Sequence, residues 1–113
     1  EAPGFTRILA TYLDDDEYAA LEESLAENPE AGAVIPGTGG FRKVRWGDSR
    51  RGKGKRGGLR VVYYWFADDR EIWFVTIYDK DEAGDISAEA KKAMRVALAA
   101  ERDVRAKRSG GNR

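Results

Sequence analysis

The stretch LRVVYYWFADDREIWFVTIY, residues 59–78, holds two runs of β-branched and aromatic residues separated by three charged residues. Such runs favour strands, and the short DDR connection predicts that strands at 59–67 and 71–78 form an antiparallel hairpin. The run at 41–46 predicts a third strand. Because the apolar content of the hairpin is nearly continuous, we expect other elements to cover both faces of the sheet.

Two helices are predicted before this sheet. Apolar residues recur every three to four positions over residues 4–12 and again over Tyr18, Leu21 and Leu25. Asp14 or Asp15 can cap the second helix, and Asn28-Pro29 can end it. Residues 28–40 are predicted to form a loop from which Val34 and Ile35 reach the core.

A last helix is predicted after the sheet, with Ser87 as its cap and its end near Lys107. Its inward stripe is expected to consist of Ala90, Met94, Ala97, Leu98 and Val104. Helices followed by a meander and another helix indicate an α+β fold with helices packed on an antiparallel sheet. We expect a single domain at 1–107 and a disordered tail at 108–113.

The composition restricts the chemistry that is open to the chain. Its 113 residues suit one domain, and they contain no Cys and no His. Disulfides, thiolate metal sites and the usual general base are therefore excluded, so no metal or other cofactor is expected. We find no signal-peptide pattern and no apolar run near the roughly 20 residues of a membrane helix, which favours a cytoplasmic location.

Charge is strongly segregated along the chain, although the net charge is zero. Residues 1–41 hold one Arg and nine acidic residues, and residues 42–60 hold nine Lys and Arg with Asp48 as the only acid. The remaining residues hold ten of each sign. The cationic segment is typical of a surface that binds a polyanion. The alternative is that the acidic segment folds back and neutralises it.

Strand alternation places part of this charge on one face. Lys43 and Arg45 share a face of their strand, and pairing with the strand that starts at Leu59 would bring Arg60 beside them. We expect the other cations of the segment to bind phosphates around this group: Arg42, Arg50, Arg51, Lys53, Lys55 and Arg56. Seven nearby glycines permit positive φ and close approach to a ligand: Gly37, Gly39, Gly40, Gly52, Gly54, Gly57 and Gly58. The alternative is that they only make turns, and their spacing does not match a P-loop.

RNA can be cleaved without histidine. The 2′-hydroxyl attacks the adjacent phosphate, which requires a base, cations for the developing charge and an acid for the leaving oxygen. A lysine crowded by other cations loses its proton more readily, and arginine binds phosphate through two donors. Tyr78 and Lys80 are candidate proton carriers at the end of the last strand. Each of these residues would otherwise have an ordinary surface or half-buried role.

Three blocks carry a resemblance to a known family: NPEAGAVIPGTGGFRKVRW at 28–46, GKGKRGGLRVVYYWF at 52–66 and FVTIYDKDE at 74–82. Together they resemble the HigB-type branch of the RelE/ParE superfamily of bacterial toxins, over nearly the whole chain. The resemblance implies a RelE-like fold and a metal-independent endoribonuclease that cleaves mRNA in the decoding site of the ribosome and inhibits translation. It also implies a toxin-antitoxin system with a cognate antitoxin, commonly of the helix-turn-helix type.

The resemblance also assigns roles by position. Lys43 and Arg45 match the basic pair after the glycine loop, Arg60 matches the arginine that binds the scissile phosphate, and Lys80 matches a lysine after the final strand. With Tyr78, these residues form the predicted catalytic set.

Two positions depart from the family pattern. Asp81 stands where RelE-type enzymes have another Arg, and Ser87 stands where they have a catalytic Tyr. Tyr78 or a loop lysine can substitute as the proton donor. Family members also open with a strand before the first helix, and we expect that strand to be missing here, which would leave a sheet edge unpaired.

Two other functions stay open. A ParE-like protein of the same fold would inhibit DNA gyrase without cutting nucleic acid. A catalytically inactive module would bind RNA or the ribosome, as the departures at Asp81 and Ser87 would allow.

Overall fold

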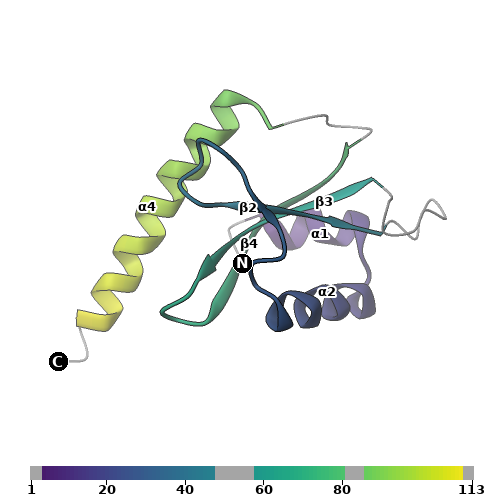
Figure 1. Ribbon diagram of the computed structural model, residues 1–113, viewed down its shortest axis with the longest axis horizontal. Coiled ribbons are helices and arrows are strands. Elements are labelled where there is room, and N and C mark those ends of the chain that lie inside the picture. Colours follow the sequence, from purple (N-terminus) through teal and green to yellow (C-terminus); the bar gives the residue numbers. More distant parts are fainter. Residues whose placement is uncertain (1–3, 48–57, 81–85, 111–113) are drawn as a thin grey trace.

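The computed structural model describes residues 4–47, 58–80 and 86–110, with side chains as far as Arg108. The predicted order of elements is confirmed, as is the α+β class with an antiparallel sheet (Figure 1). Within these residues the elements are α1 (Phe5–Tyr12), α2 (Asp15–Glu27), β1 (Ala33–Val34), β2 (Arg42–Trp46), β3 (Leu59–Phe66), β4 (Glu71–Asp79) and α4 (Ala88–Gly110). No helix in the described part of the chain is long and apolar enough to span a membrane.

The sheet has the order β1-β2-β3-β4, and every pairing is antiparallel. The hairpin predicted from residues 59–78 is confirmed as β3 and β4. Its turn is closed by a hydrogen bond from the Arg70 amide to the Ala67 carbonyl, at 3.2 Å, with Arg70 at a φ of 52°. A register shift between Val62 and Tyr63 marks a β-bulge, which adds local twist.

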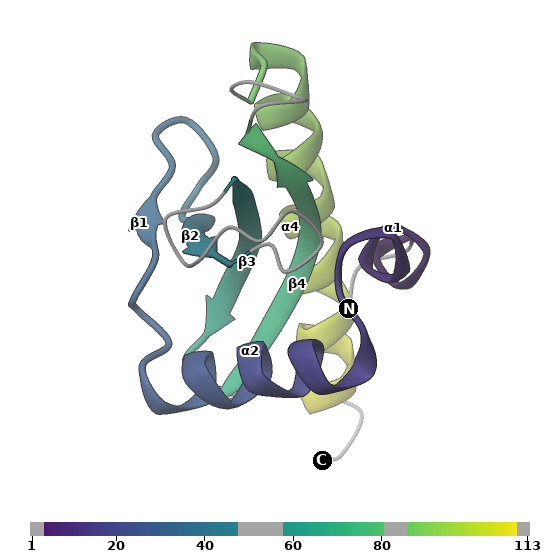
Figure 2. The same cartoon turned by 90° about the vertical axis from the view of Figure 1, so that its right-hand side faces the viewer.

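Separate apolar clusters cover the two faces of the sheet, as the continuous apolar strands predict. On one face, α1 and α2 bury Phe5, Leu9, Leu21 and Leu25 against alternate residues of β3 and β4. On the other face, α4 buries Met94 and Leu98 against the intervening residues Val62, Phe66 and Trp73. Figure 2 shows α2 and α4 on opposite sides of the strands.

The helix boundaries follow their predicted caps. The Asp14 side chain accepts from the Glu17 amide at 2.8 Å, and the Glu17 carboxylate accepts from the Asp14 amide at 3.0 Å. This capping box satisfies two amides that the first turn of α2 leaves without helical partners. At α4, the Ser87 hydroxyl accepts from the Ala90 amide at 3.1 Å.

The predicted inward stripe of α4 is partly wrong. Met94 and Leu98 are buried, whereas Ala97 is exposed and Val104 is 49% exposed. After Leu98 the half-buried positions of the helix are Glu101 and Arg105, so Val104 falls to one side of the line of contact. The helix also runs to Gly110, so residues 108–110 are helical rather than part of a tail.

The loop at 28–40 contains the two-residue edge strand β1, which was not predicted. Ile35 is buried as expected, but Val34 is 51% exposed, so its predicted place in the core is wrong. Pairing with β2 explains the difference. Val34 lies opposite Arg42 at the edge of the sheet, where its side chain is not covered.

Candidate nucleic-acid interface

Three neighbouring strands bring two arginines and a tyrosine side by side. We call Arg45, Arg60 and Tyr78 the arginine row. Arg45 of β2 pairs directly with Arg60 of β3, and Arg60 pairs with Tyr78 of β4. Directly paired residues share a face of a sheet, and Lys43, opposite Val62, lies on that same face. The predicted convergence of Lys43, Arg45 and Arg60 is therefore confirmed, while their roles stay predictions.

The surroundings of the row differ from one residue to the next. Arg45 is exposed and forms no ion pair with any described residue. Arg60 is only 7% exposed, and its guanidinium donates to the Leu59 carbonyl at 3.2 Å. Tyr78 is half-buried and packs against the cluster that contains Met94 and Leu98.

Two cations directly opposite each other oppose folding. Paired Cα atoms on antiparallel strands lie about 4.5–5.5 Å apart, and like charges at that separation destabilise the sheet. An anion that binds both guanidinium groups would remove the repulsion and gain two sets of charge-assisted hydrogen bonds. The pairing of Arg45 with Arg60 is compatible with the predicted phosphate site, which stays a prediction.

Arg42 does not join this group, contrary to its predicted place on the RNA-binding surface. Strand alternation turns it to the opposite face, where it donates to the Gly32 carbonyl at 2.8 Å and pairs with Glu30 at 3.2 Å. For Arg42, therefore, the alternative in which the acidic segment folds back and neutralises the cationic segment is correct.

Tyr63 fixes the same segment from β3. Its hydroxyl accepts from the Gly32 amide at 2.9 Å and donates to the Pro29 carbonyl at 2.7 Å. Burial raises the pKa of Tyr63, and the hydrogen bond from Gly32 and the charge of Arg42 oppose that rise only in part. The hydrogen bonds of Tyr63 and Arg42 thus fix the residues from Pro29 to Gly32, which lead into β1.

The remaining predicted site residues lie at or beyond the ends of strands. Lys80 is exposed after β4, and its amide donates to the Gly58 carbonyl at 2.6 Å. The predicted RNA-binding residues Arg50, Arg51, Lys53, Lys55 and Arg56 lie outside the described residues, as does Asp81. Ser87 is exposed and serves as the cap of α4.

The glycine loop before β2 packs on the protein itself. Gly37, Gly39 and Gly40 have φ values of 81°, 84° and 119°, which favour glycine. A Cβ at Gly40 would lie 3.1 Å from the Tyr64 ring, and Arg95 donates to the Gly37 carbonyl. For these glycines the turn alternative is therefore correct, and their close approach is to α4 and β3 rather than to a phosphate.

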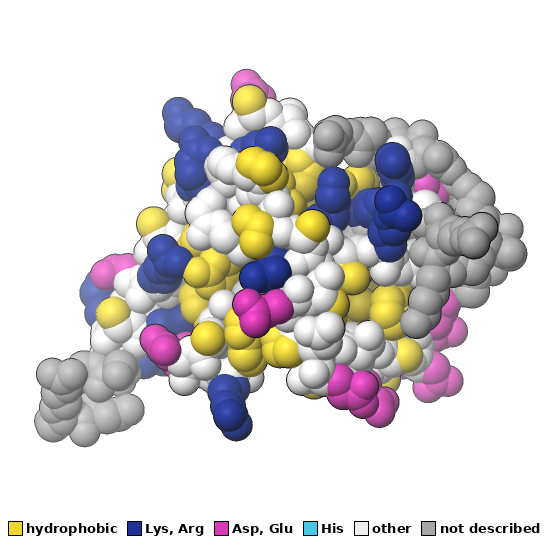
Figure 3. Space-filling view, viewed as in Figure 1, with side chains coloured by type: hydrophobic (Ala, Val, Ile, Leu, Met, Phe, Trp, Pro, Cys, Tyr) yellow, Lys and Arg dark blue, Asp and Glu magenta, His cyan; other side chains and the backbone are white. Residues whose placement is uncertain are grey.

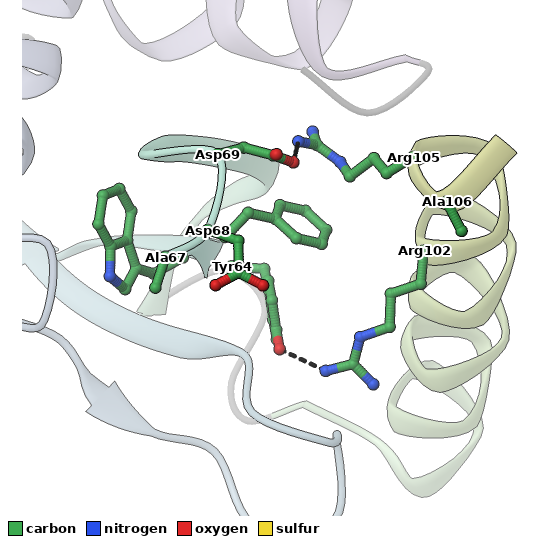
Figure 4. A pocket seen from close by; sticks show the side chains of 9 residues that line it. Tyr64, Ala67, Asp68, Asp69, Arg102, Arg105 and Ala106 are labelled. Carbon is green, nitrogen blue, oxygen red and sulfur yellow. Dashed lines mark hydrogen bonds and ion pairs between the residues drawn. The ribbon is translucent and has the colours of Figure 1, made fainter. Parts of the chain in front are cut away.

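A pocket of about 530 Å³ lies at the other end of the sheet, between the β3–β4 turn and the carboxyl-terminal half of α4 (Figure 4). Its arginines already have partners. Arg105 binds Asp69 at 2.6 Å, Glu101 at 2.8 Å and also Glu71, and Arg102 donates to the Tyr64 hydroxyl. Burial lowers the pKa of Arg105, but the hydrogen bonds that it donates to Glu71 and Asp69 outweigh this effect and leave that pKa above its ordinary value. We interpret the ion pairs and hydrogen bonds around this pocket as structural contacts that hold α4 against the β3–β4 turn.

One group of cations was not predicted from the distribution of charge along the sequence. Lys91, Lys92 and Arg95 lie on the first half of α4, within the part of the sequence where the two signs balance. Figure 3 shows Lys and Arg side chains over the upper half of α4, on the same face of the molecule as a second group beside the grey atoms. The spacing of three and four residues between these cations is the signal that would have found them.

No family model matches the chain. Among the described residues, no three Asp or Glu side chains come together in a way that could hold a metal ion.

Proposed function

We propose that this protein is the toxin of a bacterial type II toxin-antitoxin system and that it cleaves mRNA on the ribosome. The observation that carries the proposal is the direct pairing of Arg45 with Arg60, with Lys43 on the same face. A protein target such as gyrase does not require cations to oppose each other in this way. Such a pair suits a phosphate, because the phosphate charge spreads over several oxygens that two guanidinium groups can bind together.

Arg60 is the proposed ligand of the scissile phosphate. Its burial reduces solvent screening, so its charge acts more strongly on a developing phosphorane than a surface cation would. Arg45 is exposed beside it and would bind the same phosphate or the next one along the strand.

Proton transfer is assigned to the neighbours of these arginines. Lys43 would accept the proton of the 2′-hydroxyl as that oxygen bonds to phosphorus. The bond from phosphorus to the 5′-oxygen then breaks, and Tyr78 or Lys80 would donate a proton to that oxygen. The products would be a 2′,3′-cyclic phosphate and a 5′-hydroxyl, with no external reactant required.

The proposed cellular partners are those that the resemblance to the RelE/ParE superfamily implies. The substrate would be mRNA held by the ribosome in the cytoplasm. A cognate antitoxin, proposed to be of the helix-turn-helix type, would inhibit the protein by presenting carboxylates to Arg45 and Arg60 in place of phosphates.

A second candidate function is an inactive module that binds RNA or the ribosome. The observation in its favour is that Ser87 is used as the cap of α4. The position where RelE-type enzymes have a catalytic tyrosine therefore has a structural role here. Under this alternative the Arg45–Arg60 pair would still bind phosphate, but the RNA would remain intact.

The test is to add the purified protein to ribosomes stalled on a defined mRNA and to map new 5′ ends by primer extension. Naked mRNA and an Arg60→Met variant serve as controls. Cuts in the decoding-site codon that require both the ribosome and Arg60 are the expected result. Intact mRNA with salt-sensitive binding to the ribosome would overturn the nuclease proposal in favour of the inactive module. Intact mRNA without such binding would contradict both.

A further inference from the structure

The first half of α4 presents cations that no described carboxylate neutralises. Lys92 and Arg95 are exposed and Lys91 is half-buried, and none of them forms an ion pair with a described residue. We call these three residues the α4 cation patch. The second half of the same helix is different. Lys107 pairs with Asp103 at 3.1 Å, and Arg108 lies 3.8 Å from Glu101.

The arrangement of the patch is unfavourable for the helix alone. Lys91 and Arg95 are four residues apart and Lys92 and Arg95 are three apart, so their like charges repel across one turn. Lys91 and Lys92 also lie near the positive end of the helix dipole, whereas Lys107 and Arg108 lie at the negative end, where cations are stabilised. Glu89 in the first turn is the one acidic residue of this half, so the first half of α4 carries a net charge of 3 − 1 = +2 and is electropositive.

This surface lies close to the arginine row. Tyr78, the third member of the row, packs against the apolar cluster to which Met94 of α4 belongs. Met94 is one turn from Lys91 on the same helix.

From this placement we infer that the α4 cation patch binds backbone phosphates of single-stranded RNA outside the nucleotide held by Arg45 and Arg60. The inference rests on the proposed function, which it extends by a second contact with the same strand. A long RNA would touch both surfaces, whereas a trinucleotide at the arginine row would touch only the first.

The test uses Lys91→Gln/Lys92→Gln, with Lys107→Gln/Arg108→Gln as the matched control. Both variants remove two positive charges from the same helix, and both leave Arg95, which holds the Gly37 carbonyl. The Kd for an unstructured RNA of about 30 nucleotides is measured by fluorescence anisotropy between about 50 and 200 mM salt. The slope of log K against log salt should fall by about 1.4 for the first variant, since each lost phosphate contact removes about 0.7. It should not change for the control.

Binding of a trinucleotide should be the same for both variants and the unchanged protein. An unchanged slope with Lys91→Gln/Lys92→Gln, or an equal change with the control, would overturn the inference. The single variant Lys92→Gln changes only an exposed side chain and should lower the slope by about half as much. It answers the same question if the double variant is poorly folded.

Arg45→Gln separates this inference from the proposed function. If Arg45→Gln weakens binding of both RNAs while the α4 variant changes nothing, the α4 inference is wrong and the arginine row keeps its role. If neither variant changes RNA binding, the proposed function fails as well.

Discussion

Arg105 and Arg60 both lie largely buried on the α4 side of the sheet, at opposite ends of the hairpin, yet their surroundings differ. Arg105 contacts three carboxylates, and its guanidinium lies 3.8 Å from the centre of the Phe66 ring. Arg60 lies opposite another arginine. The first arrangement brings opposite charges together, whereas the second places two like charges on directly paired residues. The proposed role of Arg60 in phosphate binding rests on that second arrangement.

The same contrast divides α4. Its second half carries the ion pairs of Arg105, Lys107 and Arg108, while its first half carries the α4 cation patch. Charge counted over residues 61–113 sums to zero and so conceals the difference between the two halves. Their roles separate only when each cation is considered with its neighbours in space.

The largest expected effect comes from Arg60→Met, which keeps the length of the side chain and removes its charge. We expect cleavage of ribosome-bound mRNA to fall by about 10²–10³-fold, the usual loss when one preorganised donor to the transition state is removed. Single-turnover cleavage measures this effect. Arg60→Lys keeps the charge but loses the bidentate donor, so its cleavage rate should lie between those of the unchanged protein and Arg60→Met. Equal rates for all three proteins would remove Arg60 from the site.

A smaller effect is expected for Tyr63→Phe, on the face of the sheet away from the arginine row. The change leaves the Gly32 amide and the Pro29 carbonyl without their partner, which should lower the free energy of unfolding by about 1–3 kcal/mol. Urea titration measures it. The salt slope of RNA binding should not change, and a changed slope would show that the two faces are not independent.

The same variant carries a pH prediction. The pKa of Tyr63 in the folded protein is raised above its ordinary value of 10.0, so the unfolded chain loses this proton first. The contribution of the group to stability is complete below about pH 10 and declines as the pH rises toward the folded-state pKa. The unfolding free energy of the unchanged protein should therefore fall more steeply above pH 10 than that of Tyr63→Phe. Parallel curves would contradict the shift.

Arg105→Gln should lower the free energy of unfolding by about 1 kcal/mol, because Asp69, Glu71 and Glu101 are left to repel one another around a partly exposed site. Thermal unfolding at low and high salt measures this, and salt should reduce the loss. RNA cleavage should stay at the level of the unchanged protein. Lost cleavage with little loss of stability would assign Arg105 to function instead.

The smallest effect is of opposite sign. Arg45→Thr should raise the free energy of unfolding by about 0.2–1 kcal/mol, because it removes the repulsion from Arg60 and places a β-branched residue in a strand. The same variant should weaken RNA binding. Lys107→Gln, which removes an exposed ion pair, is the control and should change stability by less than about 0.5 kcal/mol. A destabilised Arg45→Thr would show that the two arginines do not oppose folding.

Much of the architecture could be predicted from local patterns. The hairpin followed from two apolar runs around a three-residue connection, and the ends of α2 followed from Asp14, Glu17 and Asn28. The placement of Lys43 and Arg45 beside Arg60 also followed, because side chains alternate along a strand. Each of these predictions depends on residues that are close in sequence or on the fixed repeat of a strand.

The wrong predictions concern contacts between distant segments. Arg42 was assigned to the RNA surface, but the loop at Glu30 and Gly32 lies on the opposite face and takes up its charge. The glycines before β2 left a turn and a ligand-binding alternative open, and their contacts with α4 and Tyr64 agree with the turn. Val104 has helical spacing suited to the core, but the line of contact with the sheet passes to one side of it.

The sequence by itself determined the class of the fold, the boundaries of its main elements and the face on which the arginines of β2 and β3 lie. These features arise from local capping, turn chemistry and side-chain periodicity, which act over a few residues. Only the tertiary structure decided which cations are neutralised. The energy of a charge depends on its distance to every other charge in space, and two of the three carboxylates around Arg105 come from a turn and a strand more than 30 residues before it in the chain.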